Sequence, residues 1–247
     1  MRILGIIPAR FASTRLPGKA LADIGGKSMV QLVIEQALQA EALADLVTAT
    51  DDQRIFDHVV SLGAKAVMTD HQHPSGTDRC YEALERVGLE NFDAVVNIQG
   101  DEPFIVPQQI DELCNTLRSA LGGIATLAQR ITEDHDLDDP GEVKIATDAD
   151  MTALYFSRAA IPFLREGGAA ERHKAFPYLK HVGLYAYRSG ILQQIVQLPP
   201  SSLEQAEGLE QLRWLQYGFK VRVGITEHLS FCVDTPADLE EARRRVG

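Results

Sequence analysis

The chain opens with Met-Arg-Ile-Leu-Gly-Ile-Ile-Pro-Ala-Arg at residues 1–10, where Ile3 to Ile7 form an unbroken apolar run that Pro8 ends. A run without polar alternation is typical of a strand buried on both faces of a parallel sheet. A polar, glycine-containing loop follows as far as Lys27, and Ser28 then stands where it can cap an amphipathic helix. This order of strand, loop and helix predicts an α/β fold.

The alternation continues along the chain. Apolar runs at 46–50, 66–68 and 93–98 predict further strands, with helices between them, and Asp52 stands where it can cap the helix after the first of these strands. After about residue 123 the pattern changes, and short strand-like runs with few long helices occupy residues 124–190. A helix is expected at 204–217, a strand at 220–225, and a last helix that Thr235-Pro236 begins. We expect one domain over residues 1–247 with a mostly parallel, Rossmann-like sheet and a strand-rich subregion at about 124–190.

The composition of the chain argues against several classes of function. The 247 residues carry a net charge of −11, which argues against a nucleic-acid partner because phosphate backbones need a basic surface. The cysteines, Cys80, Cys114 and Cys232, are few and far apart, which argues against a disulfide framework and a structural zinc site. No apolar stretch approaches the ~20 residues of a membrane span, and the first residues do not resemble a signal peptide. We therefore expect a cytoplasmic protein without a membrane partner.

The loop after the first strand concentrates cations in an acidic chain. Arg10, Arg15 and Lys19 lie within ten residues, and Ser13 and Thr14 add hydroxyl donors. A nucleoside triphosphate carries about four negative charges, so its site requires such a cluster. The spacing fits neither a P-loop nor a dinucleotide fingerprint. A solvated basic loop is the alternative, but the position at the end of a strand favours a phosphate site.

Two further segments have polar residues at element ends. Ser75-Gly76-Thr77 stands at an expected helix start, where amides and hydroxyls can approach a base closely; an ordinary helix cap is the alternative. Asp101 follows the buried strand at 93–98, where a carboxylate can hold Mg²⁺ against triphosphate oxygens; a turn-forming aspartate is the alternative. The neighbouring Gln99 and Glu102 favour the metal site.

Several segments together resemble the CMP-Kdo synthetases, the 3-deoxy-manno-octulosonate (Kdo) cytidylyltransferases. They are PARFASTRLPGK at 8–19, SGTDR at 75–79, NIQGDEP at 97–103, YFSRAAIP at 155–162, HVGLYAYR at 181–188, LEQLR at 209–213 and FCVDTP at 231–236. The resemblance spans about residues 3–244 and implies a nucleotidyltransferase sheet of the nucleotide-diphospho-sugar transferase type, with an insertion for sugar binding and dimerisation. It implies that these residues bind the nucleotide: Ala9, Arg10, Ser13, Lys19, Ser75, Gly76 and Gln99.

The resemblance also implies the other half of the site. The sugar-acid residues would be Arg79, Gln99, Arg158, His181, Tyr185, Glu210 and Gln211. Asp101 and Asp234 would hold magnesium, and with Arg10 and Lys19 they would form the catalytic group. Each carboxylate follows an apolar run, 95–98 or 231–233, so neighbouring parallel strands would bring them together. Singly, each of these residues has a structural alternative, and their joint match is what favours function.

Two positions depart from the family pattern. Cys232 stands where glycine is usual, so the backbone before Asp234 can be rearranged there. Gly208 stands where a larger apolar residue is usual and lowers helix propensity by ~1 kcal/mol. We therefore expect a locally weak helix at 204–217, which leaves the placement of Glu210 open.

The resemblance implies transfer of the cytidylyl group of CTP to Kdo, with release of pyrophosphate, for lipopolysaccharide biosynthesis. It also implies Mg²⁺ as cofactor and a homodimer that contacts through the second-half strands and residues 165–176. Three alternatives remain. One is a cytidylyltransferase for sialic acid or 8-amino-Kdo, and another is a CTP-binding sensor. The third is a glycosyltransferase with an Asp-x-Asp metal motif, for which the chain offers only Asp148-Ala149-Asp150 in the strand-rich subregion.

Overall fold

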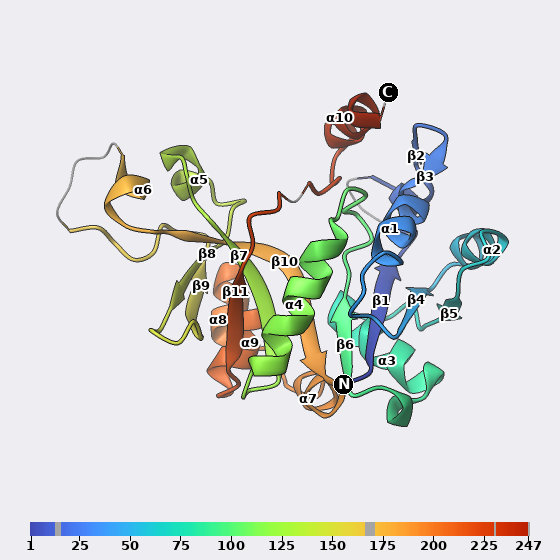
Figure 1. The fold of residues 1–247 in the computed structure, drawn as a ribbon, viewed down its shortest axis with the longest axis horizontal. Helices are drawn as coiled ribbons and strands as arrows, with labels where there is room; N and C mark the ends of the chain where they lie inside the picture. The colour runs from blue at the N-terminus through green and yellow to red at the C-terminus, as the bar shows by residue number, and fades with distance from the viewer. Residues whose placement is uncertain (13–15, 166–170, 230, 247) are drawn as a thin grey trace.

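One extended sheet organises the molecule. The structure, a computed structural model, describes residues 1–12, 16–165, 171–229 and 231–246. Within these ranges nine strands form a single sheet whose main path runs β11-β7-β10-β6-β1-β4-β5, and β8 and β9 extend it from β10 (Figure 1). The strands of this sheet are β1 (Ile3–Ala9), β4 (Asp45–Thr50), β5 (Ala66–Met68), β6 (Ala94–Asn97), β7 (Ile124–Arg130), β8 (Lys144–Thr147), β9 (Ala153–Ser157), β10 (Leu179–Arg188) and β11 (Val221–Ile225).

The sheet is mostly parallel, as the sequence predicts. β1 pairs in parallel with β4 and with β6, β4 pairs in parallel with β5, and β7 pairs in parallel with β11. β10 is the exception, because it runs antiparallel to β6, β7 and β8. The chain reaches β10 through the β8–β9 pair, which is itself antiparallel, rather than through a crossover helix. The predicted α/β fold class is confirmed, with one antiparallel strand near its middle.

Helices cover both faces of this sheet. β1 alternates between the two cores: Ile3 and Ile7 pack with α1, α2 and α4, whereas Leu4 and Ile6 pack with α3, α7 and α9. No helix in the described ranges is long and apolar enough to cross a bilayer. The helices are α1 (Met29–Ala37), α2 (Gln53–Ser61), α3 (Gly76–Val87), α4 (Pro107–Ser119), α5 (Asp134–Asp138), α6 (Arg172–Ala175), α7 (Ser189–Ile195), α8 (Ser202–Glu207), α9 (Gln211–Gln216) and α10 (Pro236–Val246), with 3-10 turns η1 (Lys19–Leu21) and η2 (Leu89–Asn91).

Side-chain caps fix the helix starts near the strand ends. Ser28 accepts a hydrogen bond from the N–H of Gln31, and Asp52 accepts one from the N–H of Arg54, so both predicted caps are confirmed. Ser28 follows a short hairpin of β2 (Asp23–Ile24) and β3 (Lys27–Ser28), against which α10 packs. This packing brings the C-terminal helix beside the loop that follows β1 (Figure 1).

The segment 204–217 is not one helix. Gly208 has a φ of 64° and ends α8, and Glu210 then stands at the N-terminus of α9. Glycine adopts this left-handed backbone without a Cβ penalty, and it is the usual residue just beyond a helix end. The predicted continuous helix is therefore wrong, because Gly208 ends one helix instead of weakening the middle of a longer one.

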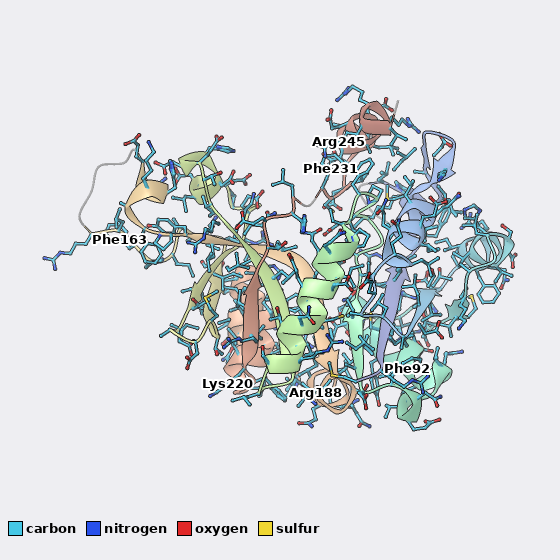
Figure 2. The ribbon with its side chains drawn as sticks, in the orientation of Figure 1. Phe92, Phe163, Arg188, Lys220, Phe231 and Arg245 are labelled. Carbon is cyan, nitrogen blue, oxygen red and sulfur yellow. The ribbon has the colours of Figure 1, made fainter. Side chains whose placement is uncertain are left out.

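The strand-rich subregion projects from the main sheet. β8, β9 and the first half of β10 lead outward to α6 at one end of the molecule (Figure 1). Residues 165–176, an expected dimer contact, include α6, while residues 166–170 lie outside the described residues. Phe163 lies in this arm with 88% of its surface exposed, and it points away from the body in Figure 2.

Replacing Gly208 tests the helix end. We expect Gly208→Ala to lower the free energy of unfolding by about 1 kcal/mol, because a Cβ is unfavourable at this backbone conformation. Gly190→Ala is the matched control: Gly190 lies inside α7 with open space around it, so alanine there should be neutral or slightly stabilising. Urea denaturation of both variants measures the difference, and equal effects would contradict this account.

Candidate active site

The carboxyl ends of β1 and β6 meet at one edge of the sheet. Ile6 of β1 is in register with Asn97 of β6, and the loop after β6 carries Gln99 and Asp101 past the end of β1. A Cβ on Gly100 would lie 2.7 Å from the carbonyl oxygen of Pro8, so only glycine allows these two segments to approach this closely. The approach places the loop after β1 beside Asp101, where ligands of such sheets bind.

Lys19 lies between the two predicted metal-binding carboxylates. Its Nζ donates to Asp101 Oδ2 at 2.5 Å and to Asp234 Oδ1 at 3.1 Å. The predicted metal pair is therefore brought together, although not by neighbouring strands. Residues 231–233 form no strand; instead, the N–H of Val233 donates to the carbonyl oxygen of Asp101 at 2.8 Å. The strand part of the expectation is wrong, because this segment crosses the sheet edge as extended chain on its way to α10.

The start of α10 fixes Asp234. Asp238 Oδ2 accepts hydrogen bonds from the N–H of Asp234 at 3.0 Å and from that of Thr235 at 2.8 Å. Thr235 Oγ1 accepts in turn from the N–H of Asp238, so the predicted capping box is confirmed. On the other side, the guanidinium of Arg245, in α10, lies 3.8 Å from the ring centre of Phe231, and Figure 2 labels the two residues next to each other.

The electrostatics of this cluster suit a cation. Burial by itself lowers the pKa of Lys19, but the charges and hydrogen bonds of Asp101 and Asp234 outweigh it and raise that pKa above its ordinary value. Two close carboxylates are stable together when a positive charge lies between them. The Lys19 ammonium has this position here, so the donor pair and its spacing fit a cation.

A hollow of about 340 Å³ opens around this cluster. Its lining contains most of the predicted nucleotide residues, Ala9, Arg10, Lys19, Ser75, Gly76 and Gln99, together with the predicted metal pair, Asp101 and Asp234. Arg79 also lines it, but its buried guanidinium donates to Asp51 at 2.8 Å and to Thr69 at 2.5 Å. Ser13 lies outside the described residues. The cationic loop and the helix-start turn, which are far apart in sequence, thus face one cavity.

The turn at the start of α3 is tied to the start of α9, which packs on the same face of the sheet. Ser75 caps α3 by accepting from the N–H of Asp78, and its hydroxyl lies 3.0 Å from Glu210 Oε1. Thr77 Oγ1 donates to the other oxygen of Glu210 at 2.7 Å. Burial raises the pKa of Glu210, and these two hydrogen bonds act against that rise. Glu210, predicted to bind the sugar acid, holds the nucleotide turn in place in this structure.

A second hollow of about 510 Å³ continues from the first, and the two share Gln99 and Asp101. Gln99 Nε2 donates to the carbonyl oxygen of Gly183 at 2.9 Å, at a bulge where the pairing of β10 with β7 shifts register. This bulge turns the Gly183 backbone toward the cavity. His181, one of the predicted sugar-acid residues, lines this second hollow.

His181 is an uncharged member of the site. Burial lowers the pKa of His181 to about 3. Its Nε2 lies 3.0 Å from the hydroxyl of Thr126, and its ring packs against Phe156 and Tyr185. A neutral imidazole offers hydrogen bonds to sugar hydroxyls and no charge to a carboxylate.

Four predicted sugar-acid residues are placed elsewhere: Arg158, Tyr185, Glu210 and Gln211 are not in the lining of either hollow as the described residues outline it. The guanidinium of Arg158 donates to the backbone oxygens of Glu207 and Pro140, both at 2.8 Å, and so joins β9 to the end of α8. Tyr185 and Gln211 are buried. Their roles in binding stay predictions.

Sequence reasoning assigned no role to several polar residues of the second hollow. Lys180 is its cation, paired with Asp136 at 3.2 Å and Glu142 at 3.5 Å, and Gln129 lies at the end of β7. Glu102 is 4% exposed; burial, and secondarily the charge of Asp101, raise its pKa to about 7. The sequence signal for Lys180 was its position next to His181 in an expected strand. That position does not show which side chains face the cavity, because the β-bulge that follows in β10 could not be read from the sequence.

Comparison with known proteins identifies this geometry. A family model described as cytidylyltransferase matches residues 4–223. The chain belongs to the cytidylyltransferase family. The 3-deoxy-manno-octulosonate cytidylyltransferase of Parabacteroides distasonis is 48% identical, over 98% of this chain and 97% of that protein. The one of Geobacter sulfurreducens is 46% identical, over 100% of both chains. The family resemblance seen in the sequence is confirmed.

Two solved structures are similar to this chain in fold. A CMP:2-keto-3-deoxy-manno-octonic acid synthetase complexed with CTP has a TM-score of 0.90 and 42% identity, covering 99% of this chain and 98% of that one. A putative glucose-1-phosphate thymidylyltransferase from Bacillus anthracis has a TM-score of 0.65 at 18% identity, covering 99% of this chain and 95% of its own. That second likeness concerns the fold alone.

The neutral state of His181 predicts a pH effect on stability. The unfolded chain protonates this histidine below its ordinary pKa near 6.5, whereas the folded chain does so only near 3. The contribution of His181 to the free energy of unfolding is therefore fully present above about pH 6.5, and it decreases as the pH falls toward 3. Between about pH 7.5 and pH 5, wild type should lose about 1–2 kcal/mol more than His181→Gln in urea denaturation. Equal losses would show that His181 is protonated in the folded state.

Proposed function

We propose that this cytidylyltransferase joins the cytidylyl group of CTP to Kdo and releases pyrophosphate. The observation that carries the proposal is the pair of connected hollows, with the Lys19–Asp101–Asp234 cluster at the edge of the first and Asp101 and Gln99 in both. One hollow has the cationic loop that a triphosphate requires, and the other has polar groups suited to a sugar acid. Relatives of nearly equal length carry this activity in their names.

The reaction needs positioning more than covalent catalysis. The anomeric 2-hydroxyl oxygen of Kdo forms a bond to the α-phosphorus of CTP and loses its proton to solvent, and the bond from that phosphorus to the bridging oxygen of pyrophosphate breaks. Arg10 and Lys19 both line the nucleotide hollow, where their charges stabilise the phosphates and the departing pyrophosphate. The shared Gln99 and Asp101 place the acceptor next to the α-phosphate, which is the entropic part of the catalysis.

Magnesium is the expected cofactor, and Asp101 and Asp234 are the residues that would hold it. When bound, the ion neutralises charge on the α-phosphate and the leaving group. Hard carboxylate oxygens are the ligands that Mg²⁺ prefers. In this structure the Lys19 ammonium lies between the two carboxylates. If an ion took that position, the ammonium would be free to contact the triphosphate instead. Asp238 keeps Asp234 in place through the backbone N–H groups that it accepts from.

The acceptor side has the chemistry of an acid sugar. A carboxylate is best bound by a cation, and Lys180 is the lysine that lines the second hollow. Sugar hydroxyls form hydrogen bonds with uncharged polar side chains. Gln99, Gln129 and His181 supply such side chains in the second hollow. These groups suit Kdo, and the names of the relatives favour it over sialic acid and 8-amino-Kdo.

The glycosyltransferase alternative has little support. Asp148 Oδ1 accepts from the N–H groups of Asp150 at 2.9 Å and Thr152 at 2.8 Å, so the Asp-x-Asp segment forms an exposed turn before β9. It contributes no side chain to either hollow as the described residues outline it. A CTP-binding sensor would not need a second hollow beside the nucleotide.

The proposal includes a homodimer and a cytoplasmic location. Phe163 and Leu154 of the projecting subregion are 88% and 62% exposed, and large apolar side chains of this kind are typical of a protein interface. Light scattering at about twice the chain mass of 27.2 kDa would support the dimer, and a monomer at assay concentrations would refute it. All three cysteines are unpaired, as is usual in a reducing compartment.

Pyrophosphate release over a grid of nucleotides and acid sugars tests the function. We expect turnover with CTP and Kdo, and with UTP a rate lower by roughly 100-fold or more, because buried groups that match the cytosine N4 and N3 positions are left unpaired by uracil. Equal turnover with UTP would contradict the nucleotide assignment. Turnover with sialic acid but not Kdo would show another sugar-acid branch, and CTP binding without pyrophosphate release would favour the sensor.

Removing one charge at a time tests the metal pair. Asp101→Asn and Asp234→Asn keep the side-chain shape, and each should slow turnover by roughly 100-fold if each carboxylate contributes ~3 kcal/mol to the transition state. Higher magnesium should restore part of the rate. Asp150→Asn, in the exposed turn, is the matched control and should leave turnover unchanged, while thermal melts check folding. Near-normal turnover at low magnesium would remove that aspartate from the metal site.

A further inference from the structure

Cys232 places a thiol beside the carboxylate pair. Cys80 and Cys114 are buried, whereas Cys232 is exposed and lies two residues before Asp234. The Sγ of Cys232 and one oxygen each of Asp101 and Asp234 all lie within 4.8 Å of one another. This group combines two hard donors with one soft donor in the described part of the chain. A thiol at this position is not required by packing, because it faces the second hollow and not a core.

A buried carboxyl group that faces the same hollow is a separate observation. Glu102 lines it together with Cys232 and Asp101, and only 4% of its surface is exposed. Its Oε2 is buried and has no hydrogen-bond partner among the described residues. On its other side, Oε1 lies 3.9 Å from where a Cβ of Gly183 would be, which is ordinary van der Waals contact, so this backbone packs against the carboxyl group without offering it a hydrogen bond. A buried oxygen without a partner is unfavourable unless a ligand or a cation completes it.

The mixed donor set decides which cations it prefers. Magnesium requires oxygen ligands in near-octahedral geometry, whereas thiolate ligands select Zn²⁺ and other thiophilic divalent ions. In a tetrahedral zinc site with bonds of ~2.0–2.3 Å, neighbouring donors lie about 3.5 Å apart. The observed limit of 4.8 Å is near enough for side-chain rotations to close the shell, and the Lys19 ammonium would have to leave.

We propose that Asp101, Cys232 and Asp234 form a mixed oxygen–sulfur site for a thiophilic divalent cation such as Zn²⁺, Cd²⁺ or Co²⁺, with the carboxyl group of Glu102 as a nearby fourth donor. The site rests on the same carboxylate pair that we propose for magnesium, so the two kinds of ion compete for it. As the ion binds, the S–H bond of Cys232 breaks, a metal–sulfur bond forms, and the proton passes to solvent. A soft cation bound in this way takes the place of the magnesium that we propose for the reaction.

Cobalt is the probe that tests this site without any turnover. Full-length protein free of nucleotide is titrated with Co²⁺, and we expect a sulfur-to-cobalt charge-transfer band in the near ultraviolet. Cys232→Ser should abolish that band and weaken Co²⁺ binding by roughly tenfold or more, because a neutral hydroxyl replaces a thiolate. Asp234→Asn should also weaken binding. Asp150→Asn is the control, and it should keep both the band and the affinity.

The inference is overturned if wild type shows no charge-transfer band, or if Cys232→Ser shows an equal band, which would assign it to Cys80 or Cys114. An unchanged band with unchanged Co²⁺ affinity in Asp234→Asn would also overturn it, because the thiol would then bind without the carboxylates.

Magnesium-dependent turnover separates this inference from the proposed function. If Asp101→Asn and Asp234→Asn lose turnover while wild type shows no band, only the sulfur site fails. If the band behaves as expected while turnover ignores both aspartates, the sulfur site stands and the magnesium assignment fails.

Discussion

The repulsion between two carboxylates is the constraint on which this site depends. Asp101 comes from the loop after β6 and Asp234 from the segment before α10, and they can lie together only with a positive charge between them. Lys19, at the end of the loop after β1, supplies that charge. The free protein therefore already has the electrostatic arrangement of a cation site. The same ammonium is available to phosphates once another cation takes its place, so the proposed metal site and the proposed nucleotide site share one cluster.

The rest of the fold keeps these three segments in contact. Gly100 allows the loop after β6 to pass close to Pro8, and the backbone bond from Val233 to Asp101 attaches the C-terminal segment to that loop. Asp238 then fixes the direction of Asp234. On the other face, Glu210 accepts from Ser75 and Thr77, so α9 holds the turn that begins α3. Helix starts, more than side chains of the strands, position the polar groups.

The two departures from the family pattern have different consequences. Gly208 has a structural one, because its left-handed backbone ends α8 and allows α9 to begin at the residue that contacts the nucleotide turn. Cys232 has a chemical one, because it adds sulfur to a site of oxygens without disturbing the backbone bond that Val233 makes next to it. Neither residue prevents Asp234 from reaching Lys19.

The sequence by itself determined the α/β class, the strand at 3–7, the helix caps at Ser28 and Asp52, and most of the nucleotide hollow, because these follow from local periodicity and from short motifs at strand ends. It did not determine which distant groups meet. The antiparallel β10, its bulge near Gly183, and the pairing of Glu210 with the α3 turn depend on long-range packing. For the same reason the sequence correctly predicted that Asp101 and Asp234 meet, but wrongly predicted that a strand before Asp234 brings them together. In the structure, residues 231–233 form no strand, and a backbone hydrogen bond from Val233 to Asp101 joins the two segments. Local pattern fixes what each segment is, whereas the side chains that face a cavity are decided only when the burial of the whole sheet selects one arrangement of its strands.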